Sequence, residues 1–273
     1  MNGAIQIRRL GNIKTLTVYS TRGGNGKTIA SVLIAIAAIK RGIKTVLIDA
    51  DVEAPSLGNL LNVGNSGPSW IDFLEERIND VNQLITDCNI PGLKVIYSPN
   101  PKIGHSFLNS KSQLWWSNAL KRSVLAENEL HKVGFELVIV DNQAGSSVNS
   151  LNNMILADAT LMVIRPSAYG VEVSERYYND MYKFLQGMKN RSDFYLWNQI
   201  LEPSDGKEKE IMDEFLGVWD KKMQDHGLIG GGRINYNSKL DFELLKDSPD
   251  LIEHYQKVES SVNSLLDKIL SNS

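Results

Sequence analysis

A glycine-rich run at residues 23–28, GGNGKT, has the residue types that bind a chain of phosphates. Glycines let backbone N–H groups approach an anion closely, a lysine reaches the terminal phosphates, and a threonine hydroxyl ligates Mg²⁺. The usual phosphate-binding loop (P-loop) reads G-x-x-x-x-G-K-[ST], and here Thr21 occupies the position of its first glycine. The three chemical requirements are still met, so the run predicts a nucleotide phosphate site at Gly26, Lys27 and Thr28.

Such a loop works only between a strand and a helix, and the flanking residues have both patterns. Residues 15–19, TLTVY, are β-branched and aromatic as in a buried strand, and the apolar run at 27–42 is typical of a helix. The loop therefore lies at a helix N-terminus, where anions bind. A second strand at residues 44–50, KTVLIDA, contains an aspartate near its end and completes a β-α-β unit.

The glycine run has two competing interpretations. A dinucleotide-binding fold also has an aspartate at the end of its second strand, but it needs G-x-G-x-x-G. After Gly24 and Gly26 the third position is Ile29, which excludes that fold. The other interpretation is a glycine turn that merely connects a strand to a helix. The combination of strand, helix and Lys-Thr pair favours the phosphate site over such a turn.

Strand patterns alternate with helical patterns along the chain, which is typical of an α/β fold with a doubly wound, mostly parallel sheet flanked by helices. Ligands of such sheets bind at the carboxyl ends of the strands. Asp49, Asp141 and Asn198 close or follow three predicted strands, so we expect them near the loop. The further predicted elements are strands at 93–98, 135–140, 159–164 and 194–197, helices at 69–80 and 112–132, and a loop at 99–109.

Length and composition are those of one globular unit. The chain has 273 residues, 42% of them hydrophobic, and no linker or repeat divides it, so residues 1–273 are expected to form a single P-loop domain. A helix at about 248–271 has an apolar face with mixed charges beside it, and we expect it to pack on that domain rather than on a membrane. No run of about 20 apolar residues and no signal peptide is apparent, so we expect a cytoplasmic protein.

The charged residues, the cysteine and the histidines argue against several function classes. With 29 Lys and Arg against 32 Asp and Glu, the net charge is −3, so no global positive field indicates nucleic acid. The only cysteine, Cys88, excludes an internal disulfide and an iron–sulfur site within one chain. The 4 histidines lack ligand spacing, which gives a zinc site or a Ser-His-Asp triad little support.

Three stretches of the chain form a combination of motifs. They are Arg22-Gly23-Gly24-Asn25-Gly26-Lys27-Thr28, Asp49-Ala50-Asp51 and Asp141-Asn142-Gln143-Ala144-Gly145. Together they resemble the motifs K-G-G-x-G-K-T, D-x-D and D-x-P-A-G of the ParA/MinD family of deviant-Walker ATPases, within the group of dimerising P-loop proteins. The resemblance continues to about Tyr236, and the chain departs from the family where Arg22 replaces the first lysine of the loop and Gln143 replaces a proline.

The resemblance implies an ATP-dependent switch in which two subunits enclose two nucleotides, with slow and partner-stimulated hydrolysis. It implies ATP and Mg²⁺ as cofactors. The residues that would hold the nucleotide are Gly23, Gly24, Asn25, Gly26, Lys27, Thr28 and Ile29, and those around the metal are Thr28, Asp49 and Asp141.

Further roles follow from the same resemblance. Asp51 would position or deprotonate the attacking water, Lys27 would serve catalysis by holding the phosphates, and the Gly145 amide would sense the γ-phosphate. Asn198 and Asn235 would flank the base. Because no N-K-x-D run follows the predicted strand at 194–197, adenine is favoured over guanine.

The two departures have open interpretations. Arg22 would reach the partner subunit's phosphate, as arginine fingers do, and its alternative is a surface ion pair. Gln143 would either bind a water molecule or face solvent.

The use of the switch is also open at this stage. An ATP-bound homodimer that acts in DNA or plasmid partitioning or in intracellular positioning is expected, with non-specific DNA or an adaptor protein as partner. The alternatives are a nucleotide-binding scaffold with little turnover and a metabolic enzyme of the ligase or amidase type. Membrane attachment and an iron–sulfur cluster are not expected.

Overall fold

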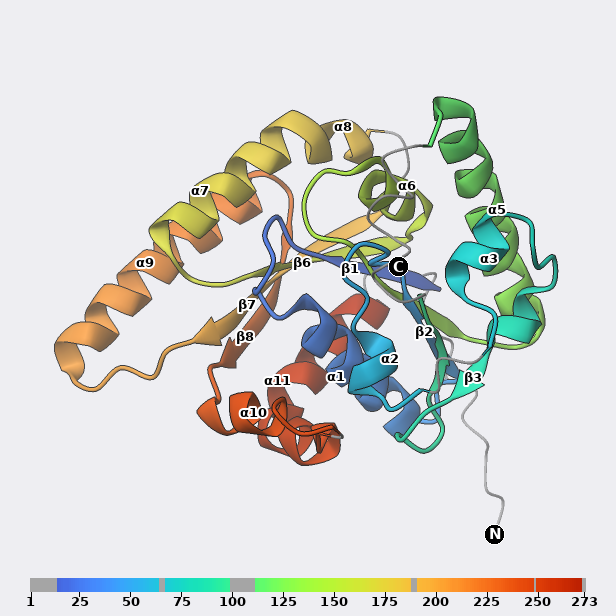
Figure 1. The fold of residues 1–273 in the computed structure, drawn as a ribbon. Coiled ribbons are helices and arrows are strands. Elements are labelled where there is room, and N and C mark those ends of the chain that lie inside the picture. Colours follow the sequence, from blue (N-terminus) through green and yellow to red (C-terminus); the bar gives the residue numbers. More distant parts are fainter. Residues whose placement is uncertain (1–13, 64–66, 99–110, 188–190, 248, 272–273) are drawn as a thin grey trace, which may run out of the picture.

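An eight-stranded sheet with the order β3-β4-β2-β5-β1-β6-β7-β8 lies at the centre of the computed structural model (Figure 1). The structure describes residues 14–63, 67–98, 111–187, 191–247 and 249–271, and the loop expected at 99–109 falls outside them. Neighbouring strands are parallel except β3 and β4, so the predicted fold class is confirmed. The strands are β1 Thr15–Tyr19, β2 Thr45–Asp49, β3 Thr86–Asp87, β4 Lys94–Ile96, β5 Leu137–Asp141, β6 Ala159–Ile164, β7 Ser192–Ile200 and β8 Ile229–Asn235.

Helices cover both faces of this sheet, with α1 and α11 on one face and α3, α5, α6, α7 and α9 on the other. None of the helices in the described part of the chain is long and apolar enough to span a bilayer. The helical elements are α1 Lys27–Lys40, α2 Leu57–Leu60, α3 Trp70–Leu74, η1 Val81–Leu84, α5 Gln113–Lys132, α6 Val148–Leu156, α7 Ala168–Tyr177, the π-helix η2 Tyr178–Tyr182, α8 Lys183–Gln186, α9 Gly206–Asp225, α10 Ser238–Glu243 and α11 Leu251–Ser271.

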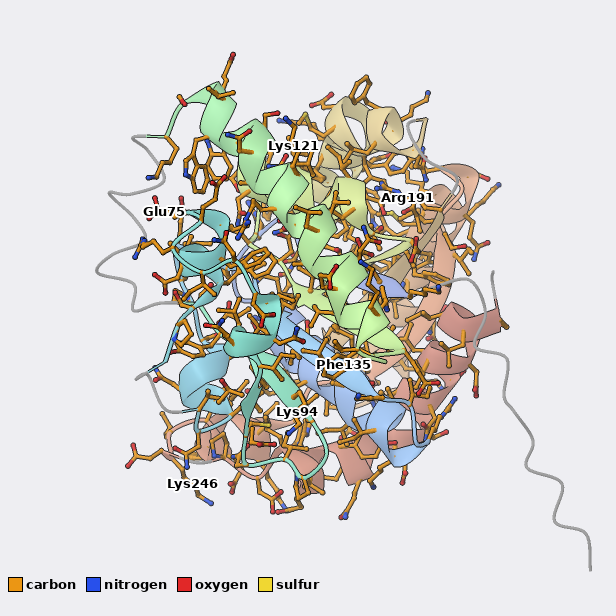
Figure 2. The ribbon with its side chains drawn as sticks, turned by 90° about the vertical axis from the view of Figure 1, so that its right-hand side faces the viewer. Glu75, Lys94, Lys121, Phe135, Arg191 and Lys246 are labelled. Carbon is orange, nitrogen blue, oxygen red and sulfur yellow. The ribbon has the colours of Figure 1, made fainter. Side chains whose placement is uncertain are left out.

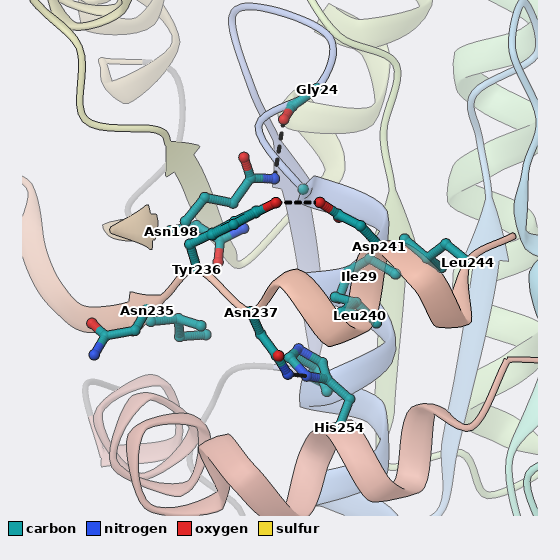
Figure 3. Close-up of a pocket in the computed structure, with 14 residues that line it drawn as sticks. Gly24, Ile29, Asn198, Asn235, Tyr236, Asn237, Leu240, Asp241, Leu244 and His254 are labelled. Carbon is teal, nitrogen blue, oxygen red and sulfur yellow. Dashed lines mark hydrogen bonds between the residues drawn. The ribbon is translucent and has the colours of Figure 1, made fainter. Parts of the chain in front are cut away.

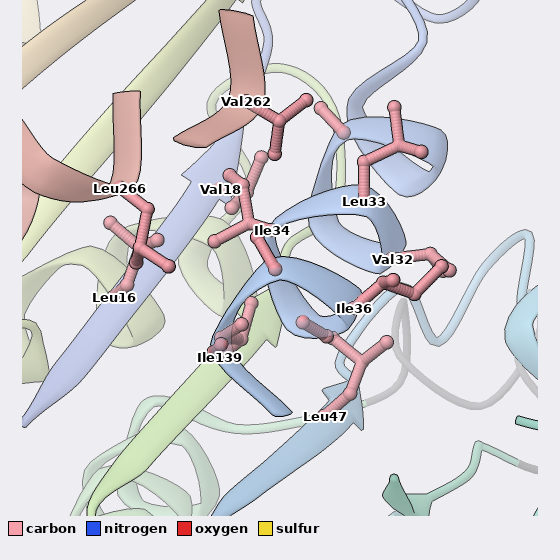
Figure 4. Close-up of a cluster of buried hydrophobic side chains, with 14 of the residues drawn as sticks. Leu16, Val18, Val32, Leu33, Ile34, Ile36, Leu47, Ile139, Val262 and Leu266 are labelled. Carbon is pink, nitrogen blue, oxygen red and sulfur yellow. The ribbon is translucent and has the colours of Figure 1, made fainter. Parts of the chain in front are cut away.

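The core beneath α1 holds the phosphate loop against the sheet (Figure 4). Strand β1 alternates, so Leu16 and Val18 face α1 and α11 while Tyr19 faces the opposite layer. Val262 and Leu266 of α11 are fully buried against this cluster. The C-terminal helix α11 therefore packs on α1, while the assignment of residues 1–273 to a single domain stays a prediction.

The opposite layer anchors the other side of the sheet. Figure 2 shows α5 running along this side, with Phe135 just beyond its end. Ala126 and Leu130 of α5 pack with Trp70 and Phe73 of α3 over β2 and β5. Because β1, β2 and β5 are buried on both faces, their carboxyl ends are held rigidly, and the residues that follow them are fixed in space.

Two predicted elements differ from the structure in length. The helix expected at 69–80 opens with Ser69 as its N-cap, but α3 ends at Leu74, and Glu76 nearby has a left-handed φ of 62°. The strand expected at 194–197 extends instead over Ser192–Ile200. Asn198 therefore lies within β7 rather than after its end, which corrects the prediction.

Candidate nucleotide and magnesium site

The loop between β1 and α1 has the backbone of an anion site. Gly24 and Gly26 both have φ of 82°, a conformation that favours glycine. Among the described residues, the N–H groups of residues 24–28 donate no hydrogen bond. These donors lie at the N-terminus of α1, where the helix dipole attracts negative charge.

Thr21 fits the loop in place of the usual first glycine. Within the described chain, positive φ outside glycine occurs only at Asn62, Glu76 and Gln199, so Thr21 has an ordinary backbone conformation. The Thr21 hydroxyl shares a hydrogen bond of 3.0 Å with the Ser174 hydroxyl of α7. The replacement of the usual first glycine by Thr21 therefore leaves the backbone of the loop well formed.

Lys27 lies among the aspartates that follow β2 and β5. Its Nζ is 3.1 Å from Asp51 Oδ2 and 3.9 Å from Asp141 Oδ1, and the lysine side chain is only 10% exposed. Burial by itself would lower the pKa of Lys27, but attraction to Asp141 and Asp51 outweighs it and the pKa is raised. Lys27 is therefore a permanent cation beside the free loop amides.

Asp49 is fully buried and organises the segment after β2. Its carboxylate accepts hydrogen bonds from the backbone N–H groups of Asp51, Ser56 and Leu57, each at 3.1 Å. Burial, reinforced by repulsion from Asp141, raises the pKa of Asp49 to about 8. A carboxyl held in this way is ready to ionise fully when a cation arrives.

Asp141 has a buried carboxylate oxygen that suits a cation. One carboxylate oxygen accepts from Ser31 Oγ at 3.1 Å, while the other, Oδ2, is buried and has no hydrogen-bond partner among the described residues. Burial raises the pKa of Asp141 more strongly than Lys27 and Thr28 lower it. A buried oxygen without a partner is unfavourable, and Mg²⁺ or one of its bound waters would satisfy it.

The donor set therefore fits Mg²⁺ that keeps part of its hydration shell. Within the described ranges, no group of three or more His, Cys, Asp or Glu side chains could hold a metal ion alone. An ion here would depend on Thr28, water and nucleotide phosphates in addition to the carboxylates, which is the usual arrangement for Mg²⁺.

The segment after β5 is ordered by buried amides. Gln143 is only 6% exposed, and its Oε1 accepts from Ser147 Oγ at 3.1 Å, so of its two open interpretations the one in which it faces solvent does not hold. The Gly145 N–H donates to the Ser20 carbonyl at 3.0 Å. The amide expected to sense a γ-phosphate is thus engaged with the phosphate loop itself.

Arg22 is exposed at the outer edge of the loop. Among the described residues it forms no ion pair, so the surface ion pair considered as its alternative is not found there. Its backbone carbonyl accepts a hydrogen bond from Ser20 Oγ at 2.7 Å, and its side chain makes no hydrogen bond with any described residue. The guanidinium group is therefore available to a ligand or a partner.

A pocket of about 210 Å³ continues from the loop toward the C-terminal part of the chain (Figure 3). Ile29, Leu33 and Leu240 supply apolar surface, and Asn198 also lines the pocket. Figure 3 shows the Asn235 amide directed away from Leu240, and the contact of Asn198 and Asn235 with a base stays a prediction.

Three polar residues of this pocket escaped the sequence analysis. Gln199 was missed because strand alternation would turn it away from Asn198, and His254 because α11 carries no sequence signal linking it to the loop. The third is Asp241, whose carboxylate accepts a hydrogen bond from the Tyr236 hydroxyl, so a carboxylate lines this pocket even without an N-K-x-D run. Asn237 Nδ2 is 3.0 Å from His254 Nδ1.

The fold and this loop define a P-loop nucleotide-binding protein. Residues 13–193 match the family described as AAA domain, and the chain belongs to that family. Together with the relatives below, the match identifies it as a member of the ParA/MinD family of deviant-Walker P-loop ATPases.

Two curated relatives match the chain in sequence. An uncharacterized ATP-binding protein of Methanocaldococcus jannaschii is 28% identical over 156 residues, which cover 57% of this chain and 54% of the relative. The septum site-determining protein MinD of Escherichia coli is 29% identical over 168 residues, 60% of this chain and 57% of the relative. The match thus spans little more than half the length of these relatives.

Solved structures extend the likeness of the fold over nearly the whole chain. MinD of Aquifex aeolicus, solved in a complex with MinC, has a TM-score of 0.70 at 17% identity and covers 95% of this chain and 97% of its own. The septum site-determining protein MinD of Pyrococcus horikoshii, complexed with Mg-ADP, has a TM-score of 0.67 at 13% identity and covers 94% and 96%.

Proposed function

We propose that the protein is an ATP-binding and ATP-hydrolysing dimeric switch that acts in intracellular positioning or in DNA partitioning. The observation that carries the proposal is the row of free N–H groups at residues 24–28 beside Lys27, facing the buried carboxyls of Asp49 and Asp141. Free donors and a cation suit a phosphate chain, and the unpartnered Asp141 oxygen suits its metal.

Lys27 and Asp51 would change partners when ATP binds. The Lys27 ammonium is paired with the Asp51 carboxylate at 3.1 Å. Phosphate oxygens would compete for the lysine, and its departure would free Asp51 to orient or deprotonate the attacking water. Nucleotide binding would therefore activate the carboxylate that the ion pair with Lys27 neutralises.

Mg²⁺, when bound, neutralises phosphate charge. Thr28 would ligate it directly, and Asp49 and Asp141 would hold its waters through the carboxylate oxygens that face the site. These residues need little rearrangement because both carboxyls are already buried at the ends of rigid strands.

Gly145 would transmit the state of the nucleotide. Its N–H is bonded to the Ser20 carbonyl, so contact with a γ-phosphate requires the amide to exchange partners and the segment after β5 to shift. Arg22, without an ion pair among the described residues, would extend from the same loop to the phosphates of a second copy.

The biological setting is inferred from the relatives. MinD proteins are named for septum site determination, and one of them is solved with the protein MinC. A slow switch whose hydrolysis is stimulated by an adaptor protein or by a DNA surface would serve such a task. The lysines of α9 alternate with acidic residues, so an adaptor protein is better supported as the partner than a DNA surface.

The test is the molar mass in solution, by light scattering on a sizing column with Mg-ATP, with Mg-ADP and without nucleotide. We expect the mass to double only with Mg-ATP, and Lys27→Ala to stay monomeric. Lys40→Ala, at the opposite end of α1, is the matched control and should behave as wild type.

Phosphate release measured in parallel separates the candidate functions. A doubling with slow phosphate release supports the switch, whereas a doubling without any release would favour the scaffold. A mass that never changes would contradict the dimeric switch and the cross-subunit role of Arg22.

A further inference from the structure

A bulge near the end of β7 turns two neighbouring side chains toward the phosphate loop. The register between β7 and β8 shifts between Trp197 and Ile200, and Gln199 has a left-handed φ of 56°. In a regular strand, consecutive side chains point to opposite faces. The bulge removes that alternation, so the amides of Asn198 and Gln199 reach the same target.

The target is a pair of consecutive carbonyl groups in the loop. Asn198 Nδ2 donates to the Asn25 carbonyl at 2.9 Å. Gln199 Nε2 donates to the Gly24 carbonyl at 3.2 Å, the hydrogen bond drawn to Gly24 in Figure 3. The approach is close, since a Cβ atom added to Gly26 would lie 2.3 Å from Asn198 Nδ2. Strand β7 is thus in direct contact with the loop through polar side chains.

These two hydrogen bonds fix the direction of the loop's N–H groups. In a planar trans peptide the C=O and N–H point to opposite sides. A carbonyl of Gly24 held toward β7 directs the N–H of Asn25 away from β7, and a carbonyl of Asn25 held there does the same for the N–H of Gly26. Both N–H groups are among the free donors of the phosphate site.

We propose that Gln199 is a positioning residue for the phosphate loop, acting together with Asn198. Its left-handed backbone is unfavourable for a residue with a side chain, and the hydrogen bond to Gly24 is what that conformation makes available. Gln199 thereby sets the loop amides for the β- and γ-phosphates before a nucleotide arrives. The inference rests on the proposed function, because it assumes that the loop binds phosphates.

Two substitutions separate this role from a structural one. Gln199→Glu keeps the length of the side chain and removes the donor, and Gln199→Gly removes the side chain while relieving the left-handed backbone. Gln83→Glu, an exposed glutamine on η1, is the matched control for the added charge. The measurements are the dissociation constants of AMP, ADP and ATP with Mg²⁺ by calorimetry or competition, and the thermal midpoint of the nucleotide-free protein.

The expected result is a loss that grows with the number of phosphates. Both variants should bind AMP like wild type and bind ADP and ATP about tenfold more weakly, which is the size of one well-placed hydrogen bond to a charged ligand. Gln199→Gly should have the same thermal midpoint as wild type or a higher one. Lower affinity with unreduced stability is the signature of a positioning residue held in a strained conformation.

Three other outcomes would overturn the inference. An equal loss for AMP, ADP and ATP would show that Gln199 contacts the base, whose pocket it also lines. Unchanged affinities in both variants would make the hydrogen bond incidental. A lower thermal midpoint in Gln199→Gly with wild-type affinities would assign it a structural role. If wild type bound none of the three nucleotides, the proposed function itself would fail, independently of Gln199.

Discussion

The phosphate half of the site and the base half are built from different kinds of chain segment. The phosphate half uses a short loop and the residues directly after β2 and β5, and its carboxyls are fully or nearly buried. The base half joins residues from β7, α10 and α11 that are distant in the chain, and several of them, such as Tyr236 and Asp241, are exposed. The difference suggests that the chemistry is fixed by rigid local geometry, whereas base recognition depends on the packing of the C-terminal region.

The largest expected effect lies in the phosphate half. Asp51→Ala should lower the rate of ATP hydrolysis by about 100-fold or more, because general bases contribute factors of that order. ATP-dependent dimerisation should persist, since Lys27 then loses its competing partner. Single-turnover phosphate release and light scattering measure the two properties.

Glu53→Gln, at a half-buried neighbouring carboxylate, serves as the control. A wild-type hydrolysis rate in Asp51→Ala would remove Asp51 from the mechanism.

The contact between the two halves should appear as a difference in unfolding free energy between alanine substitutions at two loop glycines, Gly24 and Gly26. Gly24→Ala should cost about 1 kcal/mol in unfolding free energy for its left-handed φ alone, because the space around it is open. Gly26→Ala should cost about 2–4 kcal/mol, since the new Cβ also displaces Asn198. Urea denaturation measures both, and equal costs would argue against close contact between β7 and the loop.

Removal of Mg²⁺ tests the electrostatics of the phosphate half. Chelation should reduce the thermal stabilisation by ATP, because the phosphate charge beside Asp49 and Asp141 then has no Mg²⁺ to neutralise it. In Asp141→Asn, ATP affinity should depend less on Mg²⁺, by about fivefold or roughly 1 kcal/mol. A wild-type Mg²⁺ dependence in this variant would place the ion elsewhere.

The smallest effect is expected in the base half and concerns pH. Burial, with a smaller contribution from Lys257, lowers the pKa of His254 below its ordinary value of 6.5. The unfolded chain then binds a proton at His254 more readily than the folded chain does. The contribution of the neutral His254 to the free energy of unfolding is therefore fully present above about pH 6.5 and is lost as the pH falls toward the folded-state pKa.

His254→Gln should therefore flatten the decline in stability between about pH 7 and pH 5, as measured by the urea midpoint. The same comparison in His226→Gln, a histidine outside the pocket, controls for residue type. An unchanged slope in His254→Gln would show that His254 is not tied to the folded pocket.

Much of the fold and of the phosphate half followed from the sequence because the relevant interactions are local. The strand before the loop, the glycines with left-handed φ, and the aspartates at the ends of β2 and β5 lie within short segments whose patterns indicate their structure. Glu76 shows where such reasoning fails, since its left-handed φ accompanies the early end of a helix that the pattern extends to residue 80.

The sequence by itself determined that a phosphate loop opens α1 and that acidic side chains gather beside Lys27, since parallel strands bring their carboxyl ends to one edge. Only the tertiary structure decided that Lys27 is paired with Asp51, that one oxygen of Asp141 is left without a partner among the described residues, and that Gly145 is bonded to Ser20. It also decided that Gln199 reaches the loop and that His254 lines the pocket proposed for the base. These features depend on a bulge, a burial pattern and a helix packing that join residues far apart in the chain, and no local pattern encodes them.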